Sequence, residues 1–209
     1  SAVGTAAAAR LAELVARPLP DSGRARRDQL AASCALAVWR LAQGDLAGAA
    51  GAPARLRSFT ATPGDHPRLQ RNAELCADVV EAGAATLGRR PEARRLVEQV
   101  DSVMRRGPRT TEDAWLPGFE NLLLGRLFAT LGDPARGLAA VRRGGAFDQD
   151  WILSAYLRER GRLAALAGER DAAIRDYSRY LELRADPEPA VKPIVDEVRA
   201  ELARLLAEN

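Results

Sequence analysis

The chain has 209 residues, 47 % of them apolar, which is enough to form a hydrophobic core and excludes the disordered class. Its 31 basic and 28 acidic residues leave a net charge of +3, and Lys192 is the only lysine, so arginine carries almost all of the positive charge. Charges of both signs alternate along most of the chain, which is typical of solvated helix faces and does not by itself favour nucleic-acid binding.

The apolar residues favour helix over strand. Aromatic residues make up only 5 % of the chain, Ala and Leu supply most of the apolar content, and there is no alternating run of β-branched residues. No apolar run is long enough to span a membrane, and the opening stretch "SAVGTAAAARLAELVARPLP" lacks the charged start and long apolar centre of a signal peptide. We therefore predict an all-α segment of a longer protein, cytoplasmic and not inserted in a membrane.

Turn and capping residues divide the chain into predicted helices. Gly closes a helix, and Ser, Thr, Asp or an early Pro opens the next one. With these boundaries, we predict helices over residues 5–16, 25–43, 46–59, 67–87, 90–105, 113–131, 134–143, 150–167, 170–184 and 190–207.

Four stretches share one local pattern, in which an apolar helix end is followed by Gly, polar or Pro residues and then a small residue. They are "WRLAQGDLAGAAG", "AATLGRRPEARRL", "FATLGDPARGLAAV" and "AALAGERDAAIRDY". Their turn glycines, Gly44, Gly88, Gly132 and Gly168, are 44, 44 and 36 residues apart, and small residues follow five positions later, at Ala49, Ala93, Gly137 and Ala173. A left-handed Gly ends a helix, and a small residue lets the next helix approach closely. The pattern therefore predicts four helical hairpins in a repeat array.

The last hairpin resembles a tetratricopeptide repeat (TPR). The resemblance rests on Leu157, Gly161, Ala164, Gly168, Ala173, Tyr177 and Tyr180, followed by Asp186 and Pro187. The third hairpin is similar through Leu124, Gly125, Phe128, Gly132 and Asp133, with Gly137 where Ala is usual. The first two hairpins match through their turns and small residues, although Glu81 stands where the family prefers a small residue.

The resemblance covers about residues 25–187 and implies a right-handed superhelix of stacked antiparallel hairpins, a TPR-like α-solenoid. We predict an N-terminal helix and linker over 1–24, four hairpins over 25–187 and a capping helix over 188–209. The last repeat and the tail also resemble the C-terminal repeat regions of bacterial multidomain signalling proteins. In those proteins, the region follows a serine/threonine kinase domain or a DNA-binding regulatory domain, which implies a sensor or scaffold role.

The sequence contains no enzyme signature. It has no phosphate-binding Gly-rich loop, no zinc-ligand pair and no nucleophile elbow, and its one histidine, His66, falls in a predicted loop. Cys34 and Cys76 lie among apolar residues at helical spacing, and we interpret them as small core residues outside any metal site or disulfide framework. We therefore predict a protein that is not an enzyme and has no cofactor or metal.

The first helix of each hairpin should line the concave face, where ligands of helical repeats usually bind. The candidate ligand contacts there are Asp78, Leu122, Arg126, Arg158, Glu159 and Arg162. Arg126 and Arg162 each precede a turn glycine by six residues, and together they could hold an acidic peptide or carboxylate through forked hydrogen bonds. The alternative is that Glu159 and neighbouring acids neutralise them. The family's clamp for a peptide carboxylate, which uses paired Lys and Asn, is not expected, because Cys34, Asp78 and Leu122 occupy the equivalent places.

These observations favour a non-enzymatic module that binds a peptide or protein. Apolar residues on the early concave face are suited to an amphipathic helix or to the protein's own flanking segment. The alternative is a segment of a nucleic-acid-associated transcriptional regulator, in which arginine clusters such as "GRRPEARR" and "MRRGPR" would contact phosphates on one face.

Overall fold

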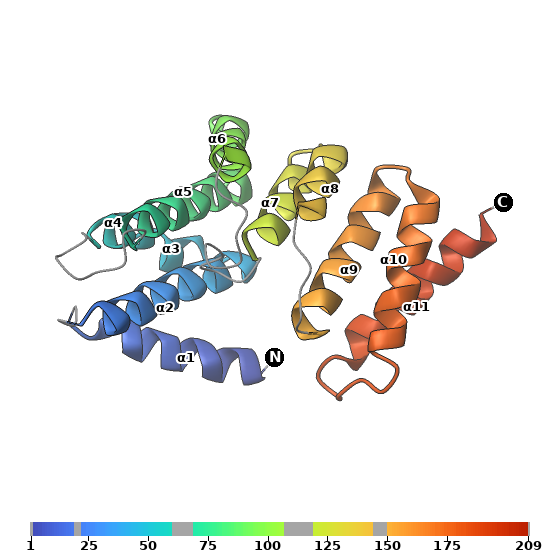
Figure 1. The fold of residues 1–209 in the computed structure, drawn as a ribbon, viewed down its shortest axis with the longest axis horizontal. Coiled ribbons are helices and arrows are strands. Elements are labelled where there is room, and N and C mark those ends of the chain that lie inside the picture. The colour runs from blue at the N-terminus through green and yellow to red at the C-terminus, as the bar shows by residue number, and fades with distance from the viewer. Residues whose placement is uncertain (1, 19–21, 60–68, 107–118, 144–149, 209) are drawn as a thin grey trace. The chain divides into compact units, whose positions relative to one another are not determined.

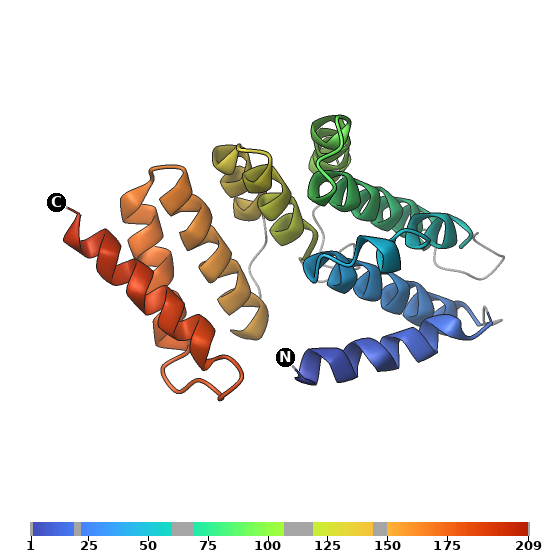
Figure 2. The same cartoon turned by 180° about the vertical axis from the view of Figure 1, so that it is seen from behind.

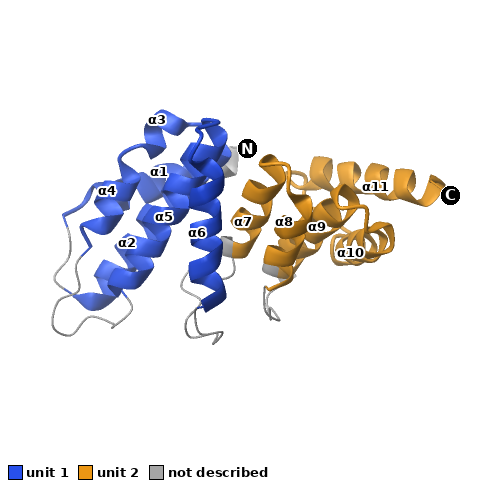
Figure 3. Ribbon diagram, turned by 90° about the horizontal axis from the view of Figure 1, so that it is seen from above, with its two compact units in different colours: residues 1–116 blue, residues 117–209 orange. Residues whose placement is uncertain are grey.

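The computed structural model describes residues 2–18, 22–59, 69–106, 119–143 and 150–208, and these residues form helices and connecting turns, without a strand in those ranges. The prediction of an all-α protein is thus confirmed for the described part of the chain. The chain divides into two compact units, Ser1–Leu116 and Pro117–Asn209, which are coloured separately in Figure 3.

Unit 1 is built around helix α2 (Gly23–Ala42). This helix contacts α1 (Ala2–Ala16), α3 (Leu46–Ala49), α4 (Ala52–Arg57) and α5 (Leu69–Leu87), and α6 (Ala93–Arg106) packs on α5 (Figure 1). The core between α2, α4 and α5 contains Leu30, Leu56, Phe59 and Val80. Most described side chains of α1 face solvent. Carbonyl groups at its C-terminal end accept hydrogen bonds from the side chain of Gln29 on α2, as described below.

The predicted helix over 46–59 is two short helices, α3 and α4, instead of one. Asp45 caps α3 by accepting a hydrogen bond from the Gly48 N–H, 2.8 Å from its Oδ1. Pro53 stands at the start of α4, where its ring can be accommodated only because the preceding turn has ended. Proline has no N–H to continue the helical ladder, so the break at Ala50 and Gly51 follows from the sequence itself.

Unit 2 is a run of consecutive helices, each packed on the next. They are α7 (Phe119–Thr130), α8 (Pro134–Arg142), α9 (Asp150–Leu166), α10 (Arg170–Leu183) and α11 (Lys192–Ala207), and α9, α10 and α11 lie side by side in Figures 1 and 2. Helix α11 buries Val195, Val198 and Leu205 against the core of unit 2, whereas Leu206 is exposed.

Three of the four hairpin turns place glycine in the left-handed region. Gly44, Gly132 and Gly168 have φ of +74°, +79° and +78°. In each turn the glycine N–H donates to the carbonyl three residues earlier, and the next residue's N–H donates to the carbonyl five residues earlier. This is the Schellman pattern, which satisfies the last carbonyls of the preceding helix.

The second turn makes the same hydrogen bonds one residue later than predicted. Here Arg89, not Gly88, is left-handed, with φ of +51°, and the Arg90 N–H donates to the carbonyl of Ala85. The repeat register of this hairpin is therefore shifted by one residue. The position in its first helix where the family prefers a small residue is then occupied by the buried Ala82 instead of Glu81.

A tight first turn compensates for this shift. The Ala93 N–H bonds to the carbonyl of Arg90, three residues back, whereas Ala49, Gly137 and Ala173 bond four residues back. The 3₁₀-like turn brings the small side chain of Ala93 into the buried position against α5 despite the later turn.

Two glycines allow α7 and α8 to approach closely. A Cβ built on Gly137 would lie 2.6 Å from the carbonyl oxygen of Gly125, and a Cβ on Gly125 would lie 2.5 Å from Cγ2 of Val141. No real Cβ tolerates such contacts, which explains why Gly stands at 137 where the resemblance expects Ala. In the last hairpin the corresponding room beside Gly161 is filled by the ring of Tyr177.

Candidate functional site

The six candidate residues are divided between the two units. Asp78 belongs to unit 1, and Leu122, Arg126, Arg158, Glu159 and Arg162 belong to unit 2. The shifted turn also removes the predicted equivalence of Asp78 with Cys34 and Leu122, since the residue ten positions before the left-handed Arg89 is the buried Val79.

Asp78 takes part in an ion-pair cluster between α4 and α5. Nη2 of Arg57 donates to Oδ1 of Asp78 at 2.8 Å, and the two Nη groups of Arg57 donate to both carboxylate oxygens of Glu81 at 2.8 and 2.9 Å. The hydrogen bond from Arg57 lowers the pKa of the Glu81 carboxyl. The cluster joins the second helical segment of the first hairpin to the second hairpin, so Asp78 has a partner within its own unit.

Leu122 and Glu159 are both buried in unit 2, and they differ in what surrounds them. Leu122 packs in the apolar core with Leu138, Tyr156 and Leu157. Glu159 is only 3 % exposed, and a buried acidic side chain requires partners that offset its loss of hydration.

Two arginines from successive hairpins supply those partners. Nε of Arg126 on α7 donates to Oε2 of Glu159 at 3.3 Å, and Nε and Nη2 of Arg162 on α9 donate to Oε1 at 3.2 and 2.5 Å. The Arg126 and Arg162 side chains nevertheless remain 44 % and 42 % exposed. The sequence placed these arginines at equivalent positions, and the structure joins them through one shared carboxylate.

Arg158 is half-buried and makes no ion pair with another described residue. It lies near Tyr177, as does Arg162. Burial, together with the charge of Glu201, raises the pKa of the Tyr177 hydroxyl to about 12, and the charges of Arg162 and Arg158 act in the opposite direction. Three guanidinium groups and one carboxylate thus give this surface of unit 2, which we call the arginine cluster (Arg126, Arg158, Glu159, Arg162), a net charge of +2.

Several arginines elsewhere in the described ranges bond to residues of their own unit. Arg142 on α8 pairs with Glu169 at the start of α10, and Arg160 pairs with Asp176 between α9 and α10. Arg105 pairs with Asp101 one turn earlier, and Arg106 donates to Ser102. Arg105, Arg106 and Arg142 therefore use part of their hydrogen-bonding capacity within their own units.

The described ranges contain no group of three or more His, Cys, Asp or Glu residues that could hold a metal ion. His66 lies outside the described residues. Within the part of the chain that the structure describes, no helix is both long enough and apolar enough to cross a membrane.

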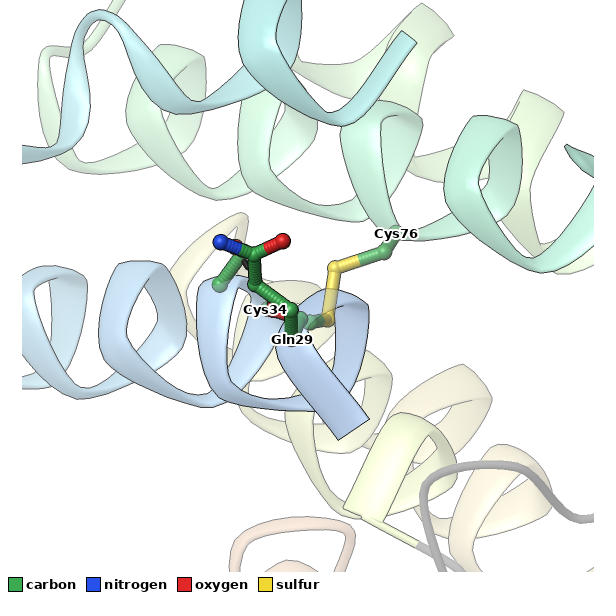
Figure 4. The surroundings of a disulfide bond; sticks show 4 residues. Gln29, Cys34 and Cys76 are labelled. Carbon is green, nitrogen blue, oxygen red and sulfur yellow. Dashed lines mark hydrogen bonds between the residues drawn. A yellow bond between two sulfur atoms is a disulfide. The ribbon is translucent and has the colours of Figure 1, made fainter. Parts of the chain in front are cut away.

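The expectation that the cysteines stay outside a disulfide is wrong. Cys34 and Cys76 are bonded to each other, and both are buried in the core of unit 1 (Figure 4). Each was correctly placed in the apolar core, but the pairing depends on the way α2 and α5 pack. One signal was available in the sequence, because their separation of 42 residues is close to the spacing of successive turns, and residues one repeat apart can meet when hairpins stack.

No protein-family model, curated protein or solved structure matches this chain. The function must therefore be argued from the geometry of the chain's own residues.

Proposed function

We propose that the chain is a non-enzymatic helical-repeat module, a TPR-like α-solenoid, that binds an acidic segment of a partner protein at the arginine cluster of unit 2. The repeated Schellman turns support the repeat architecture, because four hairpins close with the same hydrogen bonds. An acidic segment of the protein's own flanking chain would bind the arginine cluster through the same kind of ion pair.

One observation carries the proposal. Arg126 and Arg162 come from equivalent places in successive hairpins, share a single buried carboxylate and still expose their guanidinium groups. Glu159 orients both groups and cancels only one of their charges. Each guanidinium has five N–H donors, and neither Arg126 nor Arg162 uses more than two of its three nitrogens on Glu159.

The N–H groups of Arg126 and Arg162 that do not bond to Glu159, together with the nearby Arg158, can donate hydrogen bonds to carboxylates of a peptide. Orientation by Glu159 reduces the side-chain entropy that binding must overcome, which favours affinity without a deep pocket. Because the groups are more than 40 % exposed, each contact is screened and should contribute about 1 kcal/mol. Two contacts together then correspond to roughly a 30-fold change in affinity.

Binding of a fluorescent Glu-rich peptide, with a Gln-substituted peptide of the same length as its control, tests the proposal. We expect the double variant Arg126→Gln/Arg162→Gln to weaken binding of the Glu peptide by roughly 30-fold at low salt. Arg158→Gln, which removes no hydrogen bond to Glu159, should weaken binding several-fold without disturbing the fold.

Arg179→Gln is the matched control variant, since Arg179 is an exposed arginine of α10 that pairs with Glu182 outside the cluster. Equal affinity of the wild type and both cluster variants for the Glu peptide would contradict the proposal. Preference for duplex DNA over the peptide, with a steep dependence on salt concentration, would favour the nucleic-acid alternative.

A further inference from the structure

The disulfide joins the first helices of two successive hairpins. Cys34 lies in the middle of α2 and Cys76 in α5, with their Cα atoms 6.0 Å apart, which is within the ordinary range for disulfides. Figure 4 shows the two side chains meeting between the helices. The bond therefore fixes one inter-hairpin contact of unit 1 covalently.

Both sulfur-bearing side chains are inaccessible in the folded unit. Cys34 is 0 % exposed and Cys76 is 2 % exposed, and their neighbours in the core include Leu30, Ala73 and Val80. Thiol–disulfide exchange requires a thiolate to reach a sulfur atom, and an apolar surrounding disfavours the thiolate. The folded unit thus protects the bond once it has formed, so the pair acts as a structural cross-link.

The cross-link acts on more than two helices. Nε2 of Gln29, one and a half turns before Cys34 on α2, donates to the carbonyl of Arg17 at 2.7 Å and to that of Leu14 at 3.3 Å. These carbonyls close the end of α1, so α2 holds α1 at one end and is bonded to α5 near its middle. Loss of the disulfide should therefore loosen the first hairpin and α1 together.

We propose that Cys34 and Cys76 are a site of oxidative maturation, and that unit 1 becomes fully stable only where a disulfide oxidant acts on the folding chain. This inference does not depend on the proposed peptide binding. It places unit 1 in an oxidising compartment, in contrast to the cytoplasmic location expected from the sequence, because reducing systems keep cytosolic thiols unpaired.

The step is a double exchange with a disulfide-bearing oxidant such as oxidised glutathione or a thiol oxidoreductase. One cysteine thiolate attacks the oxidant disulfide and releases the first thiol, and the second cysteine thiolate then attacks the mixed disulfide and releases the second thiol. Two protein thiols become one disulfide, and the oxidant is reduced by two electrons. Burial in the folded unit requires that this exchange precede or accompany the packing of α2 on α5.

Trapping of free thiols tests the inference. The same chain is produced with and without an export signal in a bacterial host, and thiols are alkylated at lysis in denaturant before the mass is measured. We expect the exported chain to carry no alkylated cysteine and the cytosolic chain to carry two. Two alkylated cysteines in the exported chain, or none in the cytosolic chain, would overturn the inference.

Thermal unfolding of the exported chain gives an independent measurement. Because the folded unit protects the bond, the chain is reduced in urea and refolded with reductant before its Tm is compared with that of the oxidised chain. Reduction should lower the Tm of unit 1 by about 10 °C or more, and the same treatment should not change the Tm of the variant Cys34→Ala/Cys76→Ala. Equal Tm values of the oxidised wild type and the refolded, reduced wild type would show that the bond is not structural.

Discussion

A methyl group at position 161 should be unfavourable only while the ring of Tyr177 is present. A Cβ on Gly161 would lie 2.5 Å from Cδ1, 2.6 Å from Cε1 and 3.1 Å from Cγ of Tyr177. The ring is 4 % exposed and packed between α9 and α10, so it has no free space into which to move. Gly161→Ala must therefore displace the ring or separate the two helices.

The magnitude follows from two opposing terms. Replacing Gly by Ala in a helix interior stabilises the helix by about 1 kcal/mol. Inserting a methyl group into a packed core costs about 1 to 3 kcal/mol, and three simultaneous contacts with a rigid ring favour the upper part of that range. We expect Gly161→Ala to lower the free energy of unfolding by about 1 to 2 kcal/mol.

A double-mutant cycle isolates the clash. Tyr177→Ala removes the ring and by itself costs about 3 to 5 kcal/mol, but in that background Gly161→Ala should stabilise the protein by about 1 kcal/mol. The coupling energy between the two positions is then about 2 to 3 kcal/mol, which is typical of residues in direct contact. Urea unfolding followed by circular dichroism measures all four chains, and Tyr177→Phe, which keeps the ring, is the control.

A stabilising effect of Gly161→Ala in the wild-type background would refute the reasoning. The same conclusion would follow if Gly161→Ala had equal effects in the wild-type chain and in the Tyr177→Phe and Tyr177→Ala variants, because the ring would then not be the obstacle.

Two further predictions concern unit 2 at high pH and the conformation of the turns. Because burial raises the pKa of Tyr177 from 10.0 to about 12, the neutral hydroxyl is favoured in the folded state; the resulting stability is full below pH 10 and lost as the pH rises through about 12. Tyrosinate absorbance should show this late titration in the wild type and lack it in Tyr177→Phe, and the absence of any tyrosine titrating above its ordinary range would contradict the assignment. In the turns, Arg89→Gly should stabilise unit 1 by up to about 1 kcal/mol by relieving a left-handed arginine, whereas Gly132→Ala should destabilise unit 2 by about 1 kcal/mol. Thermal unfolding of both variants measures these shifts, and equal effects of the same sign would exclude a left-handed Arg89.

The sequence by itself determined the helical class and most of the helix boundaries. These depend on local physics, namely the left-handed freedom of Gly44, Gly132 and Gly168, the capping carboxylates of Asp45 and Asp133, and the helical preference of Ala and Leu. The break before Pro53 was also encoded locally, although the prediction passed over it.

Only the tertiary structure decided the features that join distant residues. The turn at Arg89 is left-handed despite the neighbouring Gly88, and the tight turn that follows keeps Ala93 buried against α5. Cys34 pairs with Cys76 because α2 packs on α5. Arg126, 33 residues before Glu159 in the sequence, bonds to the same carboxylate as Arg162. This shared contact orients two arginines with the same repeat position on one positively charged surface. Each of these contacts depends on the packing of one helix against another, which local preferences do not specify.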